Sequence, residues 1–323
     1  MEKLKEEHIK DLEASSPNSE SCPEFSMGFQ GSSGNLNLIK QGSSEGNLNK
    51  GYWLEDLLKP GRVRVHESWF RNDTVNFWRH ERMLEGVYEC LQHTKTDSWL
   101  TVGDGRYGLD AIRLRQHGFT DVTSSDIDDS LIKLAYQAGL IQKYSREDAE
   151  RFSFADNSFD YLLCKESLHH FPRPMLALYE MIRLARKAVV IIEPQDAYID
   201  LPVLEGEHVA TYEDSGNYVY KLSRRELEKI ALGLNMPAIA FKSFYDAYFS
   251  GIEFELALES NPVFVDFVQA IETMEISCRS GCSKYNMLMA VMFSEIPDYS
   301  CRVKFERCGW SFESLRRNPH ISQ

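Results

Sequence analysis

A glycine-rich turn followed by a single acidic residue is the part of this sequence best suited to chemistry. The turn, Gly-Asp-Gly-Arg-Tyr-Gly, spans Gly103–Gly108, and Asp126 lies eighteen residues beyond it. Glycines lack a Cβ atom and let a backbone approach a ligand closely, and free N–H groups at a helix start attract polar or negative groups. A carboxylate at the end of the following strand can accept hydrogen bonds from both hydroxyls of a ribose. The pattern predicts a site for an adenosine-containing cofactor and, taken alone, leaves a nicotinamide dinucleotide open.

Alternating short strands and helices must position this turn. The segment 188–192 is apolar throughout, which is typical of a parallel strand covered on both faces. Alternation of this kind predicts a doubly wound, Rossmann-like α/β sheet that binds ligands at the carboxyl edge of its strands. The expected strands are 99–102, 122–125, 159–164, 188–192, 238–241 and 287–293, and the expected helices are 109–117, 129–140, 174–185, 223–234 and 264–276.

Composition narrows the classes of function. The chain has 49 acidic and 36 basic residues and a net charge of −13, which argues against unaided binding to a nucleic-acid backbone. No apolar run approaches the roughly 20 residues that cross a bilayer, and the first residues are charged where a secretory signal would be apolar. Seven scattered cysteines suit a reducing compartment and form no clear zinc motif. We therefore expect a cytoplasmic protein with no metal site and no membrane or nucleic-acid partner.

Four segments after the turn carry a family resemblance. They are Glu-Asp-Ala-Glu at 147–150, Phe-Ser-Phe-Ala-Asp-Asn-Ser-Phe-Asp at 152–160, Leu-Leu-Cys-Lys-Glu-Ser-Leu-His-His-Phe at 162–171 and Ile-Glu-Pro at 192–194. With the glycine turn and in this order, they make residues 97–195 resemble the class I S-adenosylmethionine-dependent methyltransferases. The likeness is to their small-molecule branch, methyltransferase type 11. It implies S-adenosylmethionine as cofactor and a small-molecule acceptor.

The resemblance also implies roles for individual positions. The glycine turn would hold the methionine part of the cofactor, and the strand ends beyond it would hold the adenosine part and the mouth through which the methyl group passes. The implied positions are Gly103, Asp104, Gly105 and Gly108 for methionine, Asp126 for the ribose, Ile127, Asp148 and Ala149 for adenine, and Lys165 beside the mouth.

Two positions depart from the family's pattern. The acidic residue that commonly stands two places before the first glycine is Thr101 here, and Tyr107 occupies the place of a third glycine. We expect Asp104 to take over contact with the ammonium group of the cofactor.

Methyl transfer needs few protein groups. A sulfonium donor carries its own leaving group, so alignment of the two reactants supplies much of the catalysis, on the order of 7–11 kcal/mol. An oxygen acceptor or a protonated amine must also lose a proton, and a positioned base adds roughly 10²–10⁴-fold. His169 and His170, on the loop after the strand 159–164, and Glu166 beside them are the candidate bases.

Composition, helical spacing and the resemblance together predict three parts of the chain. Residues 1–50, rich in Ser, Gly and Asn, are expected to be a flexible polar leader, and 51–96 an N-terminal helical cap. Residues 97–323 are expected to be the methyltransferase domain, with a cofactor-binding half at 97–195 and an acceptor-binding half and tail at 196–323. A helical insertion is expected in the second half, and the oligomeric state stays open.

Several functions remain to be separated. The leading hypothesis is methyl transfer to an oxygen or nitrogen of a small polar acceptor, with a sugar or glycan precursor as one candidate. A methyltransferase-like binding or scaffold protein without turnover is kept open by Thr101 and Tyr107. The Asp-Asn-Ser-Phe-Asp block at 156–160 disfavours a nicotinamide-dependent oxidoreductase. A nucleic-acid methyltransferase is disfavoured because no Asn/Asp-Pro-Pro-aromatic segment follows 159–164 to hold a flipped base.

Overall fold

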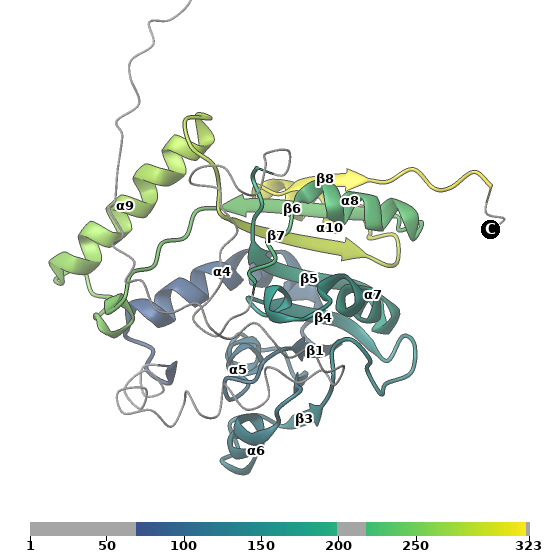
Figure 1. Ribbon diagram of the computed structural model, residues 1–323, viewed down its shortest axis with the longest axis horizontal. Coiled ribbons are helices and arrows are strands. Elements are labelled where there is room, and N and C mark those ends of the chain that lie inside the picture. Colours follow the sequence, from purple (N-terminus) through teal and green to yellow (C-terminus); the bar gives the residue numbers. More distant parts are fainter. Residues whose placement is uncertain (1–68, 199–217, 321–323) are drawn as a thin grey trace, which may run out of the picture. The chain divides into compact units, whose positions relative to one another are not determined.

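The computed structural model describes residues 69–198 and 218–320 (Figure 1). The expected leader at 1–50 and the first part of the expected cap, 51–68, lie outside the described residues. A mixed sheet of eight strands runs through the described part in the order β3-β2-β1-β4-β5-β7-β6-β8. The strands are β1 (Ser98–Val102), β2 (Asp121–Asp126), β3 (Lys143–Arg146), β4 (Phe159–Lys165), β5 (Ala185–Pro194), β6 (Ala238–Phe244), β7 (Met287–Phe293) and β8 (Ser311–Ser314).

The order of the strands indicates where a ligand-binding crevice lies in the sheet. From the central strand β1 the chain adds β2 and β3 on one side and then returns to add β4 and β5 on the other, all parallel. Strand β7 pairs antiparallel with both β5 and β6, and β8 pairs antiparallel with β6. Connections leave β1 and β4 in opposite directions, so the carboxyl ends of these two strands flank the point where open α/β folds bind ligands.

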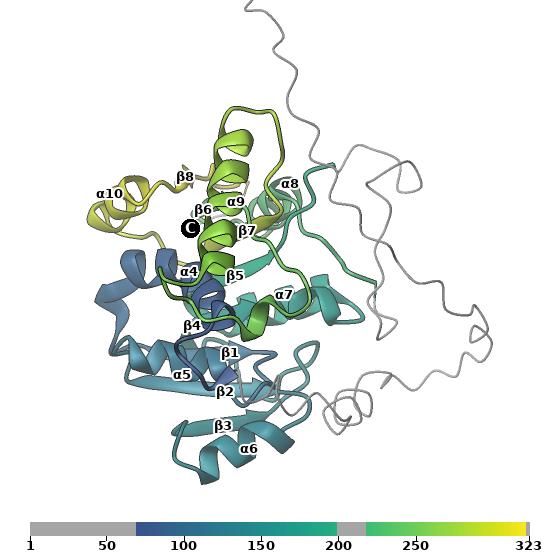
Figure 2. The ribbon, with the colours of Figure 1, turned by 90° about the vertical axis from the view of Figure 1, so that its left-hand side faces the viewer.

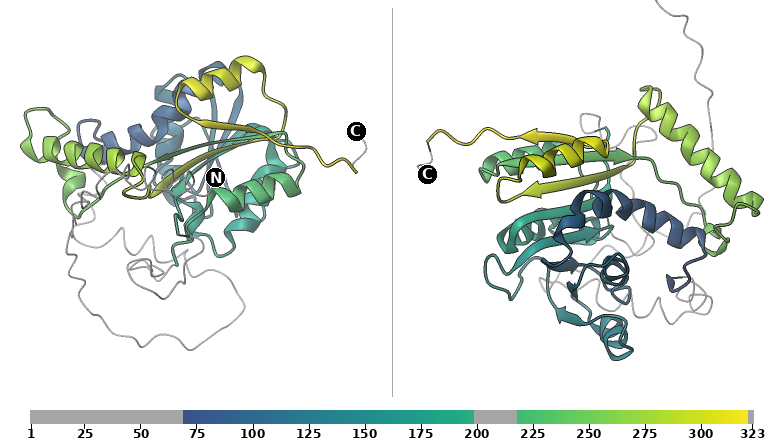
Figure 3. Two further views of the ribbon diagram at one scale, coloured as in Figure 1. Left: turned by 90° about the horizontal axis from the view of Figure 1, so that it is seen from above. Right: turned by 180° about the vertical axis from the view of Figure 1, so that it is seen from behind.

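Helices cover both faces of the sheet, which confirms the predicted doubly wound α/β class. Helices α4, α5 and α10 pack on one face and α7 and α8 on the other (Figures 2 and 3). The strand β5 contributes Val190 to the first core and Val189 to the second, which explains its unbroken apolar sequence. The helices are α4 (Val75–Leu91), α5 (Leu109–Gln116), α6 (Ser130–Gln137), α7 (Pro174–Leu184), α8 (Arg224–Gly233), α9 (Pro262–Arg279) and α10 (Tyr299–Arg307), with short 3₁₀ turns at Gln92–Thr94, Leu168–His170 and Ile252–Phe254.

Helix α4 supplies one wall of the crevice and is anchored at its start. Thr74 Oγ1 accepts a hydrogen bond from the backbone N–H of Phe77 at 3.2 Å and so caps the helix. About one turn in, the buried Arg79 pairs with the buried Asp246, which follows β6. A small separate core joins the start of α4 to the expected helix of the second half, α9, through Val75, Phe264, Phe267, Ile252 and Ile271.

The C-terminal part of the chain contains two elements that are not among those expected from the sequence. Residues 299–314 form α10 and the edge strand β8, and the Phe305 side chain is fully buried in the core on the α4 face. The short strand β3 was also missed, because its sequence Lys-Tyr-Ser-Arg has no apolar run and no buried residue. In the described part of the chain no helix is long and apolar enough to cross a membrane, and no three His, Cys, Asp or Glu side chains gather as metal ligands.

Candidate active site

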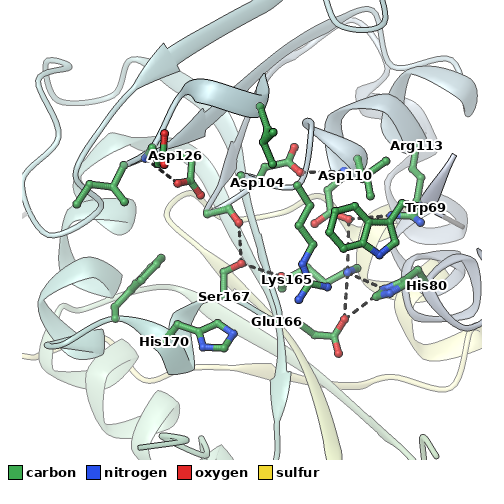
Figure 4. A pocket seen from close by; sticks show the side chains of 18 of the residues that line it. Trp69, His80, Asp104, Asp110, Arg113, Asp126, Lys165, Glu166, Ser167 and His170 are labelled. Carbon is green, nitrogen blue, oxygen red and sulfur yellow. Dashed lines mark hydrogen bonds and ion pairs between the residues drawn. The ribbon is translucent and has the colours of Figure 1, made fainter. Parts of the chain in front are cut away.

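A cavity opens at the carboxyl ends of β1, β2 and β4 (Figure 4). Its wall brings together eight of the residues expected from the sequence: Gly103, Asp104, Gly105, Asp126, Ile127, Lys165, Glu166 and His170. The remaining lining residues come largely from α4, α5 and the segments next to the expected ones: Trp69, Asn76, His80, Arg106, Leu109, Asp110, Arg113, Asp128, Leu131, Ser167 and Phe171.

The glycine turn fits tightly between its neighbours. A Cβ atom on Gly103, whose φ is +71°, would lie 2.5 Å from Ser167 Cβ, and a Cβ atom on Gly105 would lie 2.7 Å from Asp126 Oδ2. Ser167 Oγ donates a hydrogen bond to the carbonyl oxygen of Gly103 at 2.8 Å. Tyr107 keeps a left-handed backbone with φ of 61°, so the turn retains the conformation that a glycine would adopt there.

The carboxylate of Asp104 accepts hydrogen bonds from groups around the glycine turn. Its Oδ2 accepts hydrogen bonds from Thr101 Oγ1 at 2.7 Å, Ser124 Oγ at 3.2 Å and the N–H of Ala111 at 3.0 Å. Its Oδ1 accepts from the N–H of Asp110 at 3.1 Å. Burial, together with the nearby Asp110 carboxylate, raises the pKa of Asp104 to about 7. Asp104 therefore holds the start of α5 in place, and its four donors leave it poorly suited to the ammonium contact expected from the sequence.

Asp126 lies at the other side of the turn, at the end of β2. Its Oδ1 accepts a hydrogen bond from the N–H of Asp128 at 2.9 Å. Burial raises the pKa of Asp126 to about 6 against the opposing effect of its backbone hydrogen bonds. The apolar side chains of Ile127 and Leu131 line the same end of the cavity. An acceptor carboxylate beside an apolar patch suits a ribose and its base.

Charged groups gather at the end of β4. Lys165 Nζ donates to Glu166 Oε2 at 3.2 Å, and it lies 3.0 Å from His80 Nδ1 and 3.5 Å from Asp110 Oδ1. Burial and the neighbouring Lys165 ammonium hold the pKa of His80 well below its usual range. Burial opposes ionisation of Glu166, but Lys165 and the hydrogen bond with His80 outweigh it and hold the pKa of this carboxyl well below its usual range. Glu166 is therefore expected to stay ionised, and its carboxylate is a weak base.

The two adjacent histidines have different surroundings. His169 is 7% exposed, and its Nδ1 lies 2.5 Å from Oε2 of the fully buried Glu193. Glu193 Oε1 also accepts from the backbone N–H groups of Ser167 and Leu168 at 2.9 and 2.8 Å. His170 lines the cavity, and its ring lies 4.0 Å from that of His169. Glu193 thus fixes the turn that presents His170.

Some expected residues lie apart from the cavity. Gly108 is the N-cap of α5 with φ of 70°, and His169 is buried behind the turn. Asp148 is exposed, and its Oδ1 accepts from the N–H of Glu150 at 3.0 Å, while Ala149 packs against the α7 face core. None of these four is among the described residues that line the cavity.

Sequence reasoning also missed residues that the cavity contains. Asn76 and His80 are four apart on α4, and Asp110 and Arg113 are three apart on α5, so each pair shares one helix face. Polar residues at this spacing on helices that otherwise face the core are the feature of the sequence that could have predicted these four site residues. Nothing in the sequence showed that the two helices meet at the end of β4.

The chain was compared with protein-family models, curated proteins and solved structures. The family model for a methyltransferase domain matches residues 100–192. Among solved structures, the chain is similar to magnesium protoporphyrin IX methyltransferase from Synechocystis PCC 6803 with bound S-adenosylmethionine, at 12% identity and a TM-score of 0.47, over 78% of this chain and 99% of that one. It is also similar to the YcgJ protein from Bacillus subtilis, at 14% identity and a TM-score of 0.46, over 68% and 100% of the two chains. Among curated proteins, none matches this chain.

The family match falls on the strands that carry the glycine turn, Asp126 and the end of β4. The chain therefore carries a class I S-adenosylmethionine-dependent methyltransferase domain, and the resemblance found in the sequence is confirmed. It is an enzyme of this class, and its cofactor is S-adenosylmethionine. The residues present fit that cofactor, because the turn has no side chain at Gly103 or Gly105 and a half-buried acceptor, Asp126, stands beside it.

Proposed function

We propose that this protein transfers a methyl group from S-adenosylmethionine to an oxygen or nitrogen of a small polar acceptor. The observation that carries the proposal is the single cavity wall that joins Asp126 and the glycine turn to the polar groups at the end of β4. When bound, the cofactor supplies an activated methyl group with its own leaving group. The protein then has to hold the adenosine end, orient the acceptor and receive a proton.

Asp126 would bind the ribose hydroxyls, with Ile127 and Leu131 against the base. The turn Gly103–Gly105 would let its backbone lie against the methionine part. Because the lowered pKa makes the Glu166 carboxylate a weak base, it would accept a hydrogen bond from an O–H or N–H group of the acceptor rather than remove its proton. A polar acceptor such as a sugar or glycan precursor offers such groups, and this class is the first to screen.

His170 is the base that the geometry favours. It lines the cavity, whereas His169 is held behind it by Glu193. An imidazole changes protonation near neutral pH and can take a proton from an acceptor hydroxyl or amine. His169 would act as a positioning residue, since its ring contacts His170 and its Nδ1 is fixed.

Calorimetric titration of the full chain with S-adenosylmethionine and S-adenosylhomocysteine tests the cofactor part of the proposal. We expect one cofactor per chain and a loss of about tenfold or more in affinity for Asp126→Ala, because hydrogen bonds to charged groups are worth roughly 1.5–3 kcal/mol. A folded wild-type protein that binds neither compound would favour the binding or scaffold alternative.

An acceptor screen that measures release of S-adenosylhomocysteine tests the transfer. With an acceptor in hand, His170→Ala should lower kcat by roughly 10²–10⁴-fold and remove the acidic limb of the pH profile. Glu166→Gln should act mainly on the KM of the acceptor. Equal pH profiles for wild type and His170→Ala would rule out His170 as the base.

A further inference from the structure

Asp110 and Arg113 stand at the end of the cavity away from the adenosine site. Both residues lie on α5, one turn apart, and both line the cavity. Figure 4 shows them on one side of Asp104, a residue of the glycine turn, and Asp126 on the other. A ligand that places its ribose at Asp126 and runs along the turn would therefore reach this pair with its far end.

The pair has unmet hydrogen-bonding capacity. Asp110 Oδ1 is buried and accepts no hydrogen bond from any described residue. The nearest cations, Arg113 Nη1 and Lys165 Nζ, each lie 3.5 Å away, which is longer than a good hydrogen bond. Arg113 has a side chain only 4% exposed, and its Nε is likewise without a hydrogen bond among the described residues, with Glu81 Oε1 3.4 Å away. Buried polar atoms are nearly always satisfied. These two side chains have only long ion pairs, at 3.4 to 3.5 Å, so polar atoms of a ligand in the cavity would complete their hydrogen bonding.

We propose that Asp110 and Arg113 together bind the amino-acid end of S-adenosylmethionine, with Asp110 accepting from its ammonium group and Arg113 donating to its carboxylate. The inference rests on the proposed function, because it concerns the same cofactor. One anion and one cation side by side match a ligand that carries one charge of each sign. A guanidinium also presents several donors in a plane and suits a carboxylate.

Neighbouring charges are less suited to these two roles. Asp104 already accepts four hydrogen bonds from Thr101, Ser124 and the start of α5. Lys165 donates to Glu166 and lies 3.0 Å from His80 Nδ1, so it is held between these two side chains. The departure at Thr101 is thus explained within the turn. Its hydroxyl orients Asp104, and Asp110, a carboxylate six residues beyond Asp104, faces the ligand.

The test compares ligands with and without the amino-acid end. Methylthioadenosine keeps the adenosine and the sulfur of S-adenosylhomocysteine but has no ammonium or carboxylate. On the full chain, Asp110→Asn should weaken S-adenosylhomocysteine by about tenfold or more and leave methylthioadenosine within about twofold. Asp126→Asn is the matched control and should weaken both ligands by similar factors. Circular dichroism and thermal unfolding establish that each variant is folded.

A second pair of measurements separates the two charges. Wild-type protein should prefer S-adenosylmethionine over decarboxylated S-adenosylmethionine by about tenfold or more, and Arg113→Gln should lose that preference. An Asp110→Asn protein that binds S-adenosylhomocysteine as wild type does, or that loses both ligands equally, would overturn the assignment while the cofactor site stands. Wild-type protein that binds none of the ligands would instead contradict the proposed function itself.

Discussion

Glu193 at the end of β5 holds Nδ1 of His169 at 2.5 Å and, with its other oxygen, the backbone N–H groups of Ser167 and Leu168. One fully buried carboxylate thereby ties a strand end to the turn after β4. Because Ser167 also donates to Gly103, the same carboxylate indirectly braces the glycine turn on β1. The cavity wall is therefore built as a linked set of hydrogen bonds rather than as independent loops.

Replacement of Glu193 by Ala should destabilise the protein strongly. The change leaves two backbone N–H groups and His169 without their buried acceptor, and breaking a buried charged network typically costs about 3–5 kcal/mol. Glu193→Gln keeps an acceptor oxygen and should lose less. Urea denaturation measures the free energy of unfolding of the variants, and equal values for Glu193→Ala and wild type would contradict this account of the turn.

Substitution of Gly105 by Ala should weaken cofactor binding more than it weakens the fold. The added Cβ would lie 2.7 Å from Asp126 Oδ2, so the carboxylate must move from its place. We expect a loss of about tenfold in affinity for S-adenosylhomocysteine, as for other disturbed charged hydrogen bonds. Gly233→Ala is the matched control, because nothing lies within 4 Å of a Cβ there. Unchanged affinity in Gly105→Ala would show that Asp126 can shift without cost.

Cofactor affinity should depend on pH through Asp126. Burial raises the pKa of this carboxyl to about 6, and only the ionised form accepts from both ribose hydroxyls. Affinity should be flat above that pH and fall by about tenfold in total as pH drops through about 6, the loss expected when Asp126 is removed. Titrations of methylthioadenosine at several pH values measure this, and Asp126→Asn should give a flat profile. A wild-type profile that is equally flat would remove Asp126 from the ribose site.

The same raised pKa predicts the effect of Asp126→Asn on stability. A carboxyl whose pKa is higher in the folded state stabilises the fold when protonated, and that contribution is lost as pH rises through about 6. Above this pH the wild-type Asp126 side chain carries a poorly solvated charge, and the neutral Asn side chain of the variant does not. The variant should therefore unfold at the same temperature as wild type or higher, while binding its ligand less well. Scanning calorimetry in the absence of ligand checks this, and a clearly lower unfolding temperature would contradict it.

The C-terminal helix should contribute to the stability of the whole sheet. Phe305 is fully buried against Phe293 of β7 and Trp310, so Phe305→Ala should cost about 3–5 kcal/mol. Tyr299→Ala on the same helix is the control, because Tyr299 is 81% exposed and should be within about 0.5 kcal/mol of wild type. Denaturant unfolding distinguishes the two, and equal stabilities would mean that α10 is dispensable.

Local sequence patterns determined much of this fold. The long strands β4, β5 and β7 are apolar runs, and α8 begins at a capping box formed by Ser223 and Glu226. Such signals depend only on neighbours along the chain, so a sequence displays them directly. The glycine turn and Asp126 follow from the same logic, since each stands at a strand end.

Tertiary structure decided which side chains share the cavity. The sequence could not show that the contact with Glu193 holds His169 behind the cavity wall. It also could not show that the Asp104 carboxylate is hydrogen-bonded to the start of α5. The sequence also could not show that residues of α4 and α5 both contact Lys165. Such contacts join residues far apart in the chain, and they depend on how helices pack on the sheet. Sequence therefore determined the class of cofactor site, and only the folded structure assigned its charged residues.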